Sequence, residues 1–303
     1  MSVSRPRASV IVLTHNSAKT IKSVLDGIKK QEFTNFEVLI FDTASTDETL
    51  DIVKDYAYRI ISVEPNDFGH GKTRNYAARL ARGEFIIFLT HDSVPENSNW
   101  LSELVEPFSD KNVVGVYGRQ IPRQNENILD KHFQMSLYGN TKIIWKSDNW
   151  HRGDNLFSDA NSAVRKSVLL KNPYLDDIIV SEDYEWATRV LKLGFNIVYS
   201  PTASVIHSHS YTIHSLFKRN FDVGVSYKDI YTSGDSYAFV SKGLVLVKKE
   251  IKYLHQSGHT LLIPLAILRN IIRYFAIQLG EHEHLFTEKF KAERLTAQKW
   301  YWK

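Results

Sequence analysis

Four short apolar runs alternate with helical patterns over the first 90 residues of the chain. The runs are rich in β-branched residues, and between them apolar residues recur at helical spacing, as at Ile21, Leu25 and Ile28. We expect strands at residues 8–13, 37–41, 59–63 and 85–89, with helices at residues 17–30, 45–56 and 73–82. This succession predicts an α/β fold built on a mostly parallel sheet.

The character of the sequence changes after Tyr211. Between residues 112 and 211 the patterns are mixed, and a polar, aromatic stretch at residues 125–149 is expected to be partly loop. We expect strands at residues 113–117, 196–199 and 203–207, a strand leading into a helix at residues 157–170, and a helix at residues 181–193. Beyond residue 211 helical periodicity dominates. We therefore divide the chain into residues 1–211 and a mainly helical region at residues 212–303.

Positive charge is concentrated in the helical region. Residues 212–303 contain 14 Lys and Arg against 8 Asp and Glu, whereas residues 1–211 contain 24 against 26. This asymmetry is typical either of contact with an anionic partner or of a solvated helical surface. Nucleic acid is not expected, because the basic region has no recognised nucleic-acid-binding motif.

The most apolar segment of the chain lies at residues 261–279. It contains Arg269 and Arg273, whereas a membrane-spanning helix needs about 20 largely uncharged residues. We expect an amphipathic or core helix here and no transmembrane helix. The chain has no cysteine, which excludes a disulfide, a thiolate metal site and a cysteine nucleophile. The apolar run at residues 10–13 is too short for a secretory signal, so a cytoplasmic protein is expected.

Polar residues follow three of the predicted strands. Thr14 and Asn16 follow the first strand, Asp42 follows the second, and His91 and Asp92 follow the fourth. Ligands of open α/β sheets bind where the carboxyl ends of the strands meet. A carboxylate such as Asp42 can accept hydrogen bonds from a base or ribose, and one such as Asp92 can bind a hard divalent cation. The alternative for both is capping of the next turn or helix.

Three further segments offer candidate site residues. Gly71 and Arg74 lie in a segment where glycine permits close approach of the backbone and where positive charge suits a diphosphate; a plain loop is the alternative. Asp183, at a helix start, is either a general base or a favourable charge at the helix amino end. His207 and His209 share one face of a strand and are candidate metal ligands or structural histidines.

The order of these segments resembles that of family 2 glycosyltransferases with the glycosyltransferase-A fold. The segments that carry the resemblance are VIVLTHN, FDTASTDET, FGHGKTRNYA, FLTHDSVP, FSDANSAVR, SEDYEWATRVLKLG and VIHSHSY, which together span about residues 7–225. FGHGKTRN is most similar to bacterial rhamnosyltransferases that use dTDP-L-rhamnose. The resemblance implies a Rossmann-like, mostly parallel sheet with a helical C-terminal extension, and a catalytic domain within residues 1–211.

The resemblance also implies roles for individual residues. The donor site would contain Thr14, Asn16, Asp42, Gly71, Arg74, His91 and Asp92, and the acceptor side would contain Asn161, Glu182 and Trp186. Asp183 would be the catalytic base. Thr90 stands where the family's Asp-X-Asp motif has its first acid, so Mg²⁺ or Mn²⁺ would depend on Asp92 together with His207, or with His209 as the alternative.

The activity implied is inverting transfer of L-rhamnose to a saccharide acceptor during synthesis of a bacterial cell-surface polysaccharide such as O-antigen. An acceptor linked to polyprenyl diphosphate would place the protein at the inner face of the plasma membrane. The helical region, with its terminal Trp300-Tyr301-Trp302, would then contact the membrane surface, the catalytic domain or a second copy of the chain. The alternatives are a UDP-hexose or other donor, and a non-catalytic nucleotide-binding protein.

Overall fold

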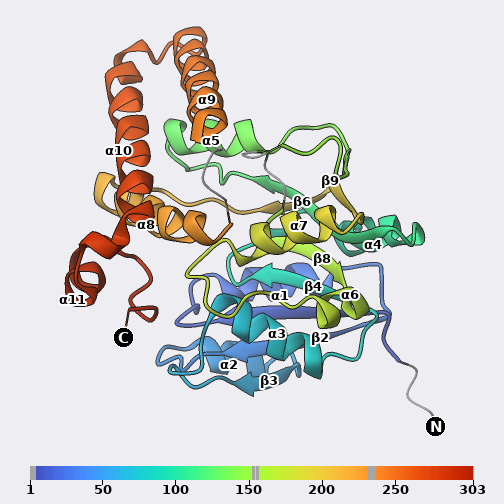
Figure 1. Cartoon of the computed structure of the whole chain (residues 1–303). Helices are drawn as coiled ribbons and strands as arrows, with labels where there is room; N and C mark the ends of the chain where they lie inside the picture. The colour runs from blue at the N-terminus through green and yellow to red at the C-terminus, as the bar shows by residue number, and fades with distance from the viewer. Residues whose placement is uncertain (1–4, 152–153, 155–156, 231–235, 303) are drawn as a thin grey trace.

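A mixed, mostly parallel sheet of nine strands forms the centre of the molecule (Figure 1). The computed structural model describes residues 5–151, 154, 157–230 and 236–302. The strands are β1 (Ala8–Thr14), β2 (Phe36–Asp42), β3 (Arg59–Ser62), β4 (Phe85–Thr90), β5 (Val94–Pro95), β6 (Val113–Ile121), β7 (Ile143–Trp145), β8 (Asn161–Arg165) and β9 (Asn196–Ile206). Their order is β3-β2-β1-β4-β8-β6-β9-β5, and β7 pairs with β9.

Helices cover both faces of this sheet. Alternate residues of β1 point to opposite faces, so Val10 and Val12 belong to one core cluster and Ile11 to the other. The first cluster includes residues of α1 (Ile21–Lys29), α2 (Thr49–Lys54) and α4 (Trp100–Val105). The second includes residues of α3 (His70–Leu80), α6 (Lys166–Lys171) and α7 (Glu182–Lys192). The α/β architecture expected from the periodicity is confirmed.

One antiparallel strand shapes the crevice at the carboxyl end of β4. β8 lies between β4 and β6 and runs antiparallel to both. Its first residue, Asn161, therefore pairs with Leu89 near the end of β4, and the Thr90 amide donates a hydrogen bond to the Ala160 carbonyl at 3.4 Å. This reversal brings residues 158–160 next to the loop that carries Asp92.

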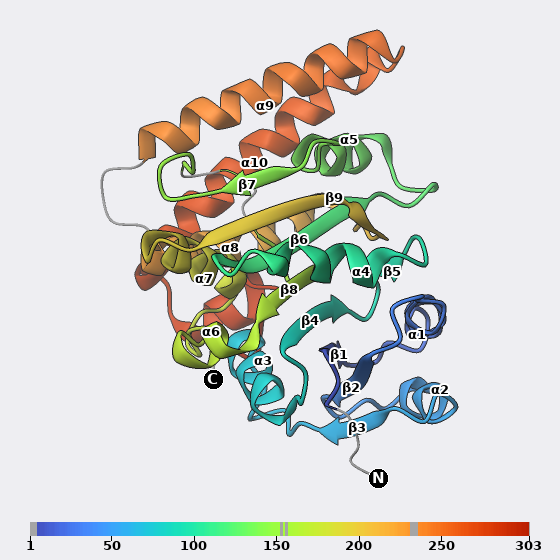
Figure 2. The same ribbon diagram turned by 90° about the vertical axis from the view of Figure 1, so that its right-hand side faces the viewer.

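The C-terminal region is helical, as expected. It contains α8 (Ile213–Ile230), α9 (Ser236–Gln256), α10 (Ile263–Glu281) and α11 (Glu288–Phe290), with short 3-10 turns at Thr260–Leu262 and Glu283–Leu285 and a π turn at Lys291–Leu295. α9 and α10 form a hairpin that projects beyond the sheet (Figure 2), while α10 also packs along α8. The chain end returns to the α/β part, where the Tyr301 hydroxyl donates to the Asp177 carbonyl at 3.1 Å.

The stretch at residues 125–149, expected to be partly loop, also contains α5 (Ile128–Leu137) and β7. α5 is capped by the Asn127 side chain, which accepts a hydrogen bond from the Asp130 amide. Two other local predictions differ from the structure. α3 begins at His70, three residues earlier than expected. The two strands expected at residues 196–207 are one strand, β9, whose pairing with β6 contains a register shift between Gly118 and Gln120.

The helix spanning Thr260–Glu281 also departs from expectation. It is long and apolar enough to cross a membrane by length and composition, with a mean hydropathy of 1.6, whereas its two arginines predict no such helix. The same length and composition occur in core helices of soluble proteins. Only 22% of its most apolar 18-residue window is buried in the protein, however, whereas a core helix is mostly buried.

Candidate active site

Asp92, His207 and His209 converge at the carboxyl ends of β4 and β9. β5 pairs with the end of β9, with Val94 opposite Ile206, and this pairing brings the two histidines to the loop after β4. The Nε2 atom of His207 lies 3.5 Å from Oδ1 of Asp92, and Nδ1 of His209 lies 3.8 Å from Oδ2. One ligand atom from each of the three residues lies within 4.8 Å of the other two. The trio predicted from the sequence is thus close in space.

The charge states of this trio suit a divalent cation. Burial acts to raise the pKa of Asp92, but hydrogen bonding to His207 and the charges of the nearby histidines outweigh it, so the pKa stays well below its usual range. Burial lowers the pKa of His209 to about 4. At neutral pH Asp92 is ionised and His209 is neutral, which are the forms that bind metal ions.

Gln120 orients one imidazole of the trio. It lies on β6, is buried, and its Oε1 is 2.8 Å from Nδ1 of His207. Because Oε1 only accepts hydrogen bonds, Nδ1 of His207 is the donor in this contact, and Nε2 is the ring nitrogen that faces Asp92 and would face a metal ion held there. Gln120 is not among the site residues predicted from the sequence, although a polar residue within the apolar pattern of β6 could have indicated it.

Arg123 adds a positive charge beside the trio. Its Nη2 donates to the Asp92 carbonyl at 2.8 Å and lies 4.0 Å from Oδ2 of Asp92, and the side chain remains one-third exposed. This residue was also missed, because only the fold brings the loop after β6 to Asp92. Thr90 does not join the trio; its hydroxyl lies 2.7 Å from that of Ser93.

Asp183 lies at the start of α7 and is half-buried. Its Oδ2 accepts a hydrogen bond from the Asp159 amide at 2.9 Å, and its Oδ1 accepts one from the Tyr184 amide at 2.8 Å. Two backbone donors therefore hold the carboxylate in one orientation. Ser181, immediately before α7, has a φ of 66°, in the left-handed region, and such strained backbone is concentrated at functional sites.

Arg74 belongs to a buried cluster of charged residues with Asp159 and Glu182, the neighbour of Asp183 in the chain. Its guanidinium pairs with Glu182, and its Nε lies 3.2 Å from Oδ2 of Asp159. Burial raises the pKa of Glu182 to about 7 and that of Asp159 to about 6, and the charge of Arg74 opposes both shifts. Arg74 was predicted to approach the donor diphosphate, but its side chain is only 8% exposed and is engaged by two carboxylates.

A continuous chain of contacts joins this cluster to the metal-binding candidates. The Asp159 amide bonds to Asp183, and the hydroxyl of the preceding Ser158 accepts a hydrogen bond from Nε2 of Gln120 at 3.0 Å. Gln120 in turn contacts His207. Residues 158–159, placed here by the antiparallel β8, therefore connect the base candidate with the metal trio.

The residues predicted to contact the nucleotide lie at the ends of β1 and β2. The Thr14 hydroxyl donates to Oδ1 of Asp42 at 2.7 Å, and the Ser45 amide donates to Oδ2 at 3.0 Å. Asn16 has a φ of 47°, and its Oδ1 accepts from the Thr46 amide at 2.8 Å. His91 lies between this group and Asp92, with Nδ1 3.3 Å from the Thr20 hydroxyl.

Three predicted site residues have structural roles here. Gly71 is not in a ligand-binding loop but in α3, where an added Cβ would lie 2.4 Å from the Leu175 carbonyl oxygen. A glycine here lets the non-helical segment at residues 174–175 pack closely against α3. Asn161 is fully buried and bonded to Trp100 and the Ala203 carbonyl. Trp186 is also fully buried. Because both side chains are buried, the role predicted for Asn161 and Trp186 on the acceptor side would be to position the residues around them.

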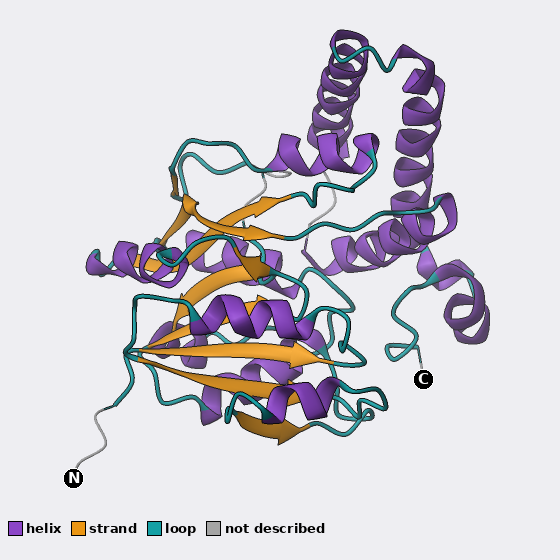
Figure 3. Ribbon diagram, turned by 180° about the vertical axis from the view of Figure 1, so that it is seen from behind, coloured by secondary structure: helices purple, strands orange, loops and turns teal. Residues whose placement is uncertain are grey.

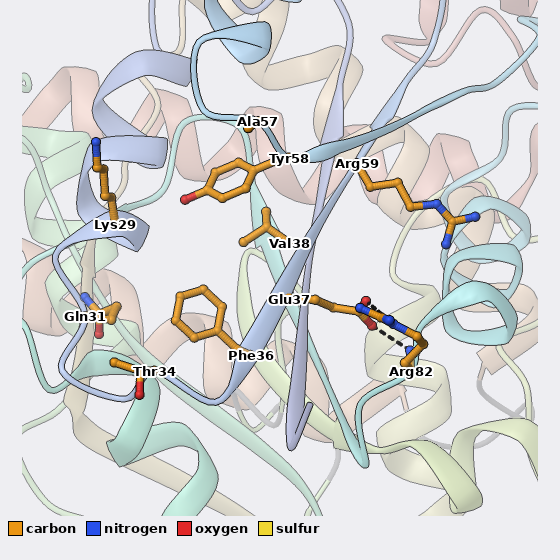
Figure 4. Close-up of a pocket in the computed structure, with 10 residues that line it drawn as sticks. All are labelled: Lys29, Gln31, Thr34, Phe36, Glu37, Val38, Ala57, Tyr58, Arg59 and Arg82. Carbon is orange, nitrogen blue, oxygen red and sulfur yellow. Dashed lines mark hydrogen bonds and ion pairs between the residues drawn. The ribbon is translucent and has the colours of Figure 1, made fainter. Parts of the chain in front are cut away.

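A separate groove opens at the opposite edge of the sheet. This pocket of about 700 Å³ is lined by the amino ends of β2 and β3, and an ion pair between Arg82 and Glu37, 2.8 Å long, forms part of one side of it (Figure 4). The strand carboxyl ends point the other way, toward the side of the molecule that carries the C-terminal helices (Figure 3). The groove is thus remote from Asp92 and Asp42.

The chain matches known glycosyltransferase sequences over most of its length. The family described as Glycosyl transferase family 2 matches residues 9–172. The O-antigen chain rhamnosyltransferase WbaN of Salmonella anatum is 34% identical over 91% of this chain and 90% of that protein. The O-antigen chain rhamnosyltransferase RfbN of Salmonella typhimurium is 31% identical over the same shares.

Solved structures share the fold. The mannosyltransferase PcManGT of Pyrobaculum calidifontis, solved with GDP-Man and Mn²⁺, superposes with a TM-score of 0.57 at 19% identity, covering 99% of this chain and 86% of that one. Residues 1–349 of S. aureus TarS superpose with a TM-score of 0.56 at 20% identity, covering 94% and 85%. At these identities the likeness establishes the glycosyltransferase-A fold alone.

Proposed function

Because the chain belongs to glycosyltransferase family 2, we propose that it transfers L-rhamnose from dTDP-L-rhamnose to a saccharide acceptor in O-antigen synthesis, with inversion. The sugar is supported by the names of the two Salmonella relatives. The observation that carries the reaction is the network from Asp183 through residues 158–159 and Gln120 to His207 and Asp92. This network supports a reaction in which a base and a charge-stabilising group act at one crevice.

Asp183 would accept the proton of the attacking acceptor hydroxyl. The acceptor oxygen then bonds to the anomeric carbon as the bond from that carbon to the diphosphate oxygen breaks, so one displacement inverts the configuration. The two backbone hydrogen bonds to Asp183 orient its carboxylate for this step. Glu182 supports it indirectly by pairing with Arg74.

Asp92 and His207, with His209 as the alternative or an additional ligand, would hold Mg²⁺ or Mn²⁺. A divalent cation at this position supplies positive charge that stabilises the departing nucleoside diphosphate. Arg123 would contribute a fixed positive charge to the same diphosphate, because its guanidinium is partly exposed beside Asp92. The divalent cation and Arg123 would thereby both stabilise the diphosphate, although Asp92 is the only carboxylate among the proposed metal ligands.

The nucleotide would lie over the ends of β1 and β2. Thr14, Asn16 and Asp42 would line this part of the pocket, and His91 would separate it from the metal site. In this arrangement residues 1–211 form the catalytic domain. Residues 212–303 would serve a membrane surface or a second copy, and an acceptor on polyprenyl diphosphate would place the protein at the inner face of the plasma membrane.

A donor screen tests this proposal. Purified protein is incubated with dTDP-L-rhamnose, UDP-glucose, UDP-N-acetylglucosamine or GDP-mannose and a panel of saccharide acceptors, and nucleoside diphosphate release is measured with and without Mn²⁺. Acceptor-dependent release is expected with dTDP-L-rhamnose, and it should be lost in Asp92→Ala. If nucleoside diphosphate release did not depend on added metal and was retained in Asp92→Ala, the assignment of Asp92 as a metal ligand would be excluded.

A UDP-hexose donor is the second candidate. TarS, which shares only the fold with this chain, has been solved with UDP-GlcNAc, so UDP-sugars are compared with dTDP-L-rhamnose. A thermal-shift comparison separates the two, since the correct donor stabilises the folded chain by mass action more than the wrong one. Nucleotide binding without any diphosphate release would instead indicate a non-catalytic nucleotide-binding protein.

A further inference from the structure

The polarity of α10 is inverted relative to a surface helix. Its only charged residues are Arg269, Arg273 and Glu281, and both arginines face the protein and are buried. The side chains that face outward are apolar or aromatic. Leu265, Ile267, Leu268, Ile271, Tyr274 and Phe275 are each between 39% and 59% exposed, and we call these six residues the outer face of α10.

Specific partners fix this orientation. Arg269 forms a buried ion pair with Asp130 on α5 and donates to the Tyr211 carbonyl at 3.0 Å. Arg273 lies over the ring of Phe133, 4.3 Å from its centroid. Turning α10 to hide its apolar residues would leave Asp130 as an unpaired buried carboxylate, which is costly. The outer face is therefore a stable feature of the fold.

A contiguous apolar surface of this kind marks an interaction site. Its neighbour α9, which packs against α10, carries the exposed residues Lys248, Lys249 and Lys252. The one acid in the described part of α9, Glu250, is buried and accepts a hydrogen bond from Asn270 at 2.6 Å. The described surface of α9 therefore presents positive charge without exposed acids.

We propose that the α9–α10 hairpin docks on an anionic phospholipid surface. The outer face of α10 would insert among the acyl chains at the interface, and the lysines of α9 would pair with lipid phosphates. The helix lies in the membrane plane and does not cross it, because Arg269 and Arg273 remain bonded to the protein. Leu261, 96% exposed at the hairpin tip, adds a further apolar contact.

The terminal aromatic residues are excluded from this surface. Trp300 packs against Phe68 with ring centroids 5.5 Å apart, and Trp302 packs over the amine of Lys291. Of the three contacts considered for Trp300-Tyr301-Trp302, the structure has packing of the chain end on the rest of the protein. Lipid binding falls to the hairpin alone.

Vesicle flotation of the full chain tests the proposal. Binding is expected to vesicles containing phosphatidylglycerol and to be much weaker to pure phosphatidylcholine. Leu268→Glu with Phe275→Glu should lower the bound fraction at least about tenfold. Leu170→Glu on α6 is the matched control, because Leu170 and Leu268 are 47% and 48% exposed, and it should bind like the unaltered chain.

A second variant keeps the test independent of folding effects. Lys248→Glu with Lys249→Glu changes only exposed polar residues and should weaken binding to anionic vesicles roughly tenfold or more. Unchanged binding in both double variants would overturn the proposal. The proposal would also be overturned if the chain did not bind vesicles and instead formed a dimer that Leu268→Glu dissociates. The outer face of α10 would then bind a second copy of the chain. Resistance to alkaline carbonate extraction would instead indicate a spanning helix. None of these readouts depends on the donor or on transfer activity.

Discussion

The imidazole of His207 faces the carboxylate of Asp92, with 3.5 Å between Nε2 and Oδ1. The two residues are far apart in the sequence and meet because β5 pairs with the end of β9. The other ring nitrogen of His207 bonds to Gln120. A metal site built on this pair therefore depends on a residue that would not touch the metal.

Gln120→Leu tests that dependence. The substitution preserves volume but removes the acceptor for Nδ1–H, so the ring loses its fixed tautomer and orientation. We expect Mn²⁺ affinity in the presence of nucleoside diphosphate to fall about 10- to 100-fold, measured by calorimetric titration. Gln124→Leu, at an exposed position after the same strand, is the control. Equal affinity in both variants would show that Gln120 does not orient the site.

Arg74→Met distinguishes a structural arginine from a nucleotide ligand. Removing the guanidinium leaves Glu182 and Asp159 buried without their cation, so we expect a loss of about 3–5 kcal/mol in the free energy of unfolding. Arg79→Met on the exposed side of the same helix should change it by less than about 0.5 kcal/mol. Urea titration measures both. An Arg74→Met chain of normal stability with weakened donor binding would restore the role predicted from the sequence.

The ends of strands are easier to predict from this sequence than the environments of side chains. Thr14, Asp42 and Asp92 were found because apolar runs mark strands and the residue after a run marks its carboxyl end. Spacing along the chain does not indicate whether a side chain faces the crevice or the core. For that reason the sequence did not indicate that Trp186, predicted to be on the acceptor side, is fully buried.

The contacts that join Asp183 to the metal-binding candidates could not be predicted from the sequence, because hydrophobic periodicity does not indicate the order or direction of strands in a sheet. Residues 158–159 reach Gln120 and Asp183 because β8 runs antiparallel between β4 and β6. A strand pattern is the same in either direction, so the sequence indicated a strand near residue 161 without its orientation. Arg123 was missed for the same reason, since its neighbours are 31 and 85 residues away in the chain.

Asp183→Asn separates the base from the binding site. The amide keeps the size of the side chain but cannot accept the acceptor proton, so we expect kcat to fall by about 10²- to 10⁴-fold, while donor affinity changes little. Diphosphate release and donor titration measure the two effects. Asp177→Asn, at an exposed aspartate before α7, should leave both unchanged. Comparable transfer by Asp183→Asn would remove this residue as the base.

Glu182 and Asp159 should make folding stability depend on pH. Their folded pKa values are about 7 and about 6, above the ordinary 4.5 and 3.8. At pH values between the ordinary and the folded pKa of each acid, the acid is protonated in the folded chain and ionised in the unfolded chain. The free energy of unfolding contributed by these acids is therefore largest below about pH 4 and falls as the pH rises toward 7.

Glu182→Gln removes one titrating group from the cluster and should flatten this dependence. Urea unfolding at about pH 5 and about pH 7.5 measures the difference in each chain. The unaltered chain should lose more stability between the two pH values than Glu182→Gln does, because glutamine has no proton to release. Glu64→Gln, on the exposed surface, should keep the original dependence. An unchanged pH dependence in Glu182→Gln would mean that the buried cluster holds Glu182 ionised throughout, with Arg74 outweighing the cost of burial.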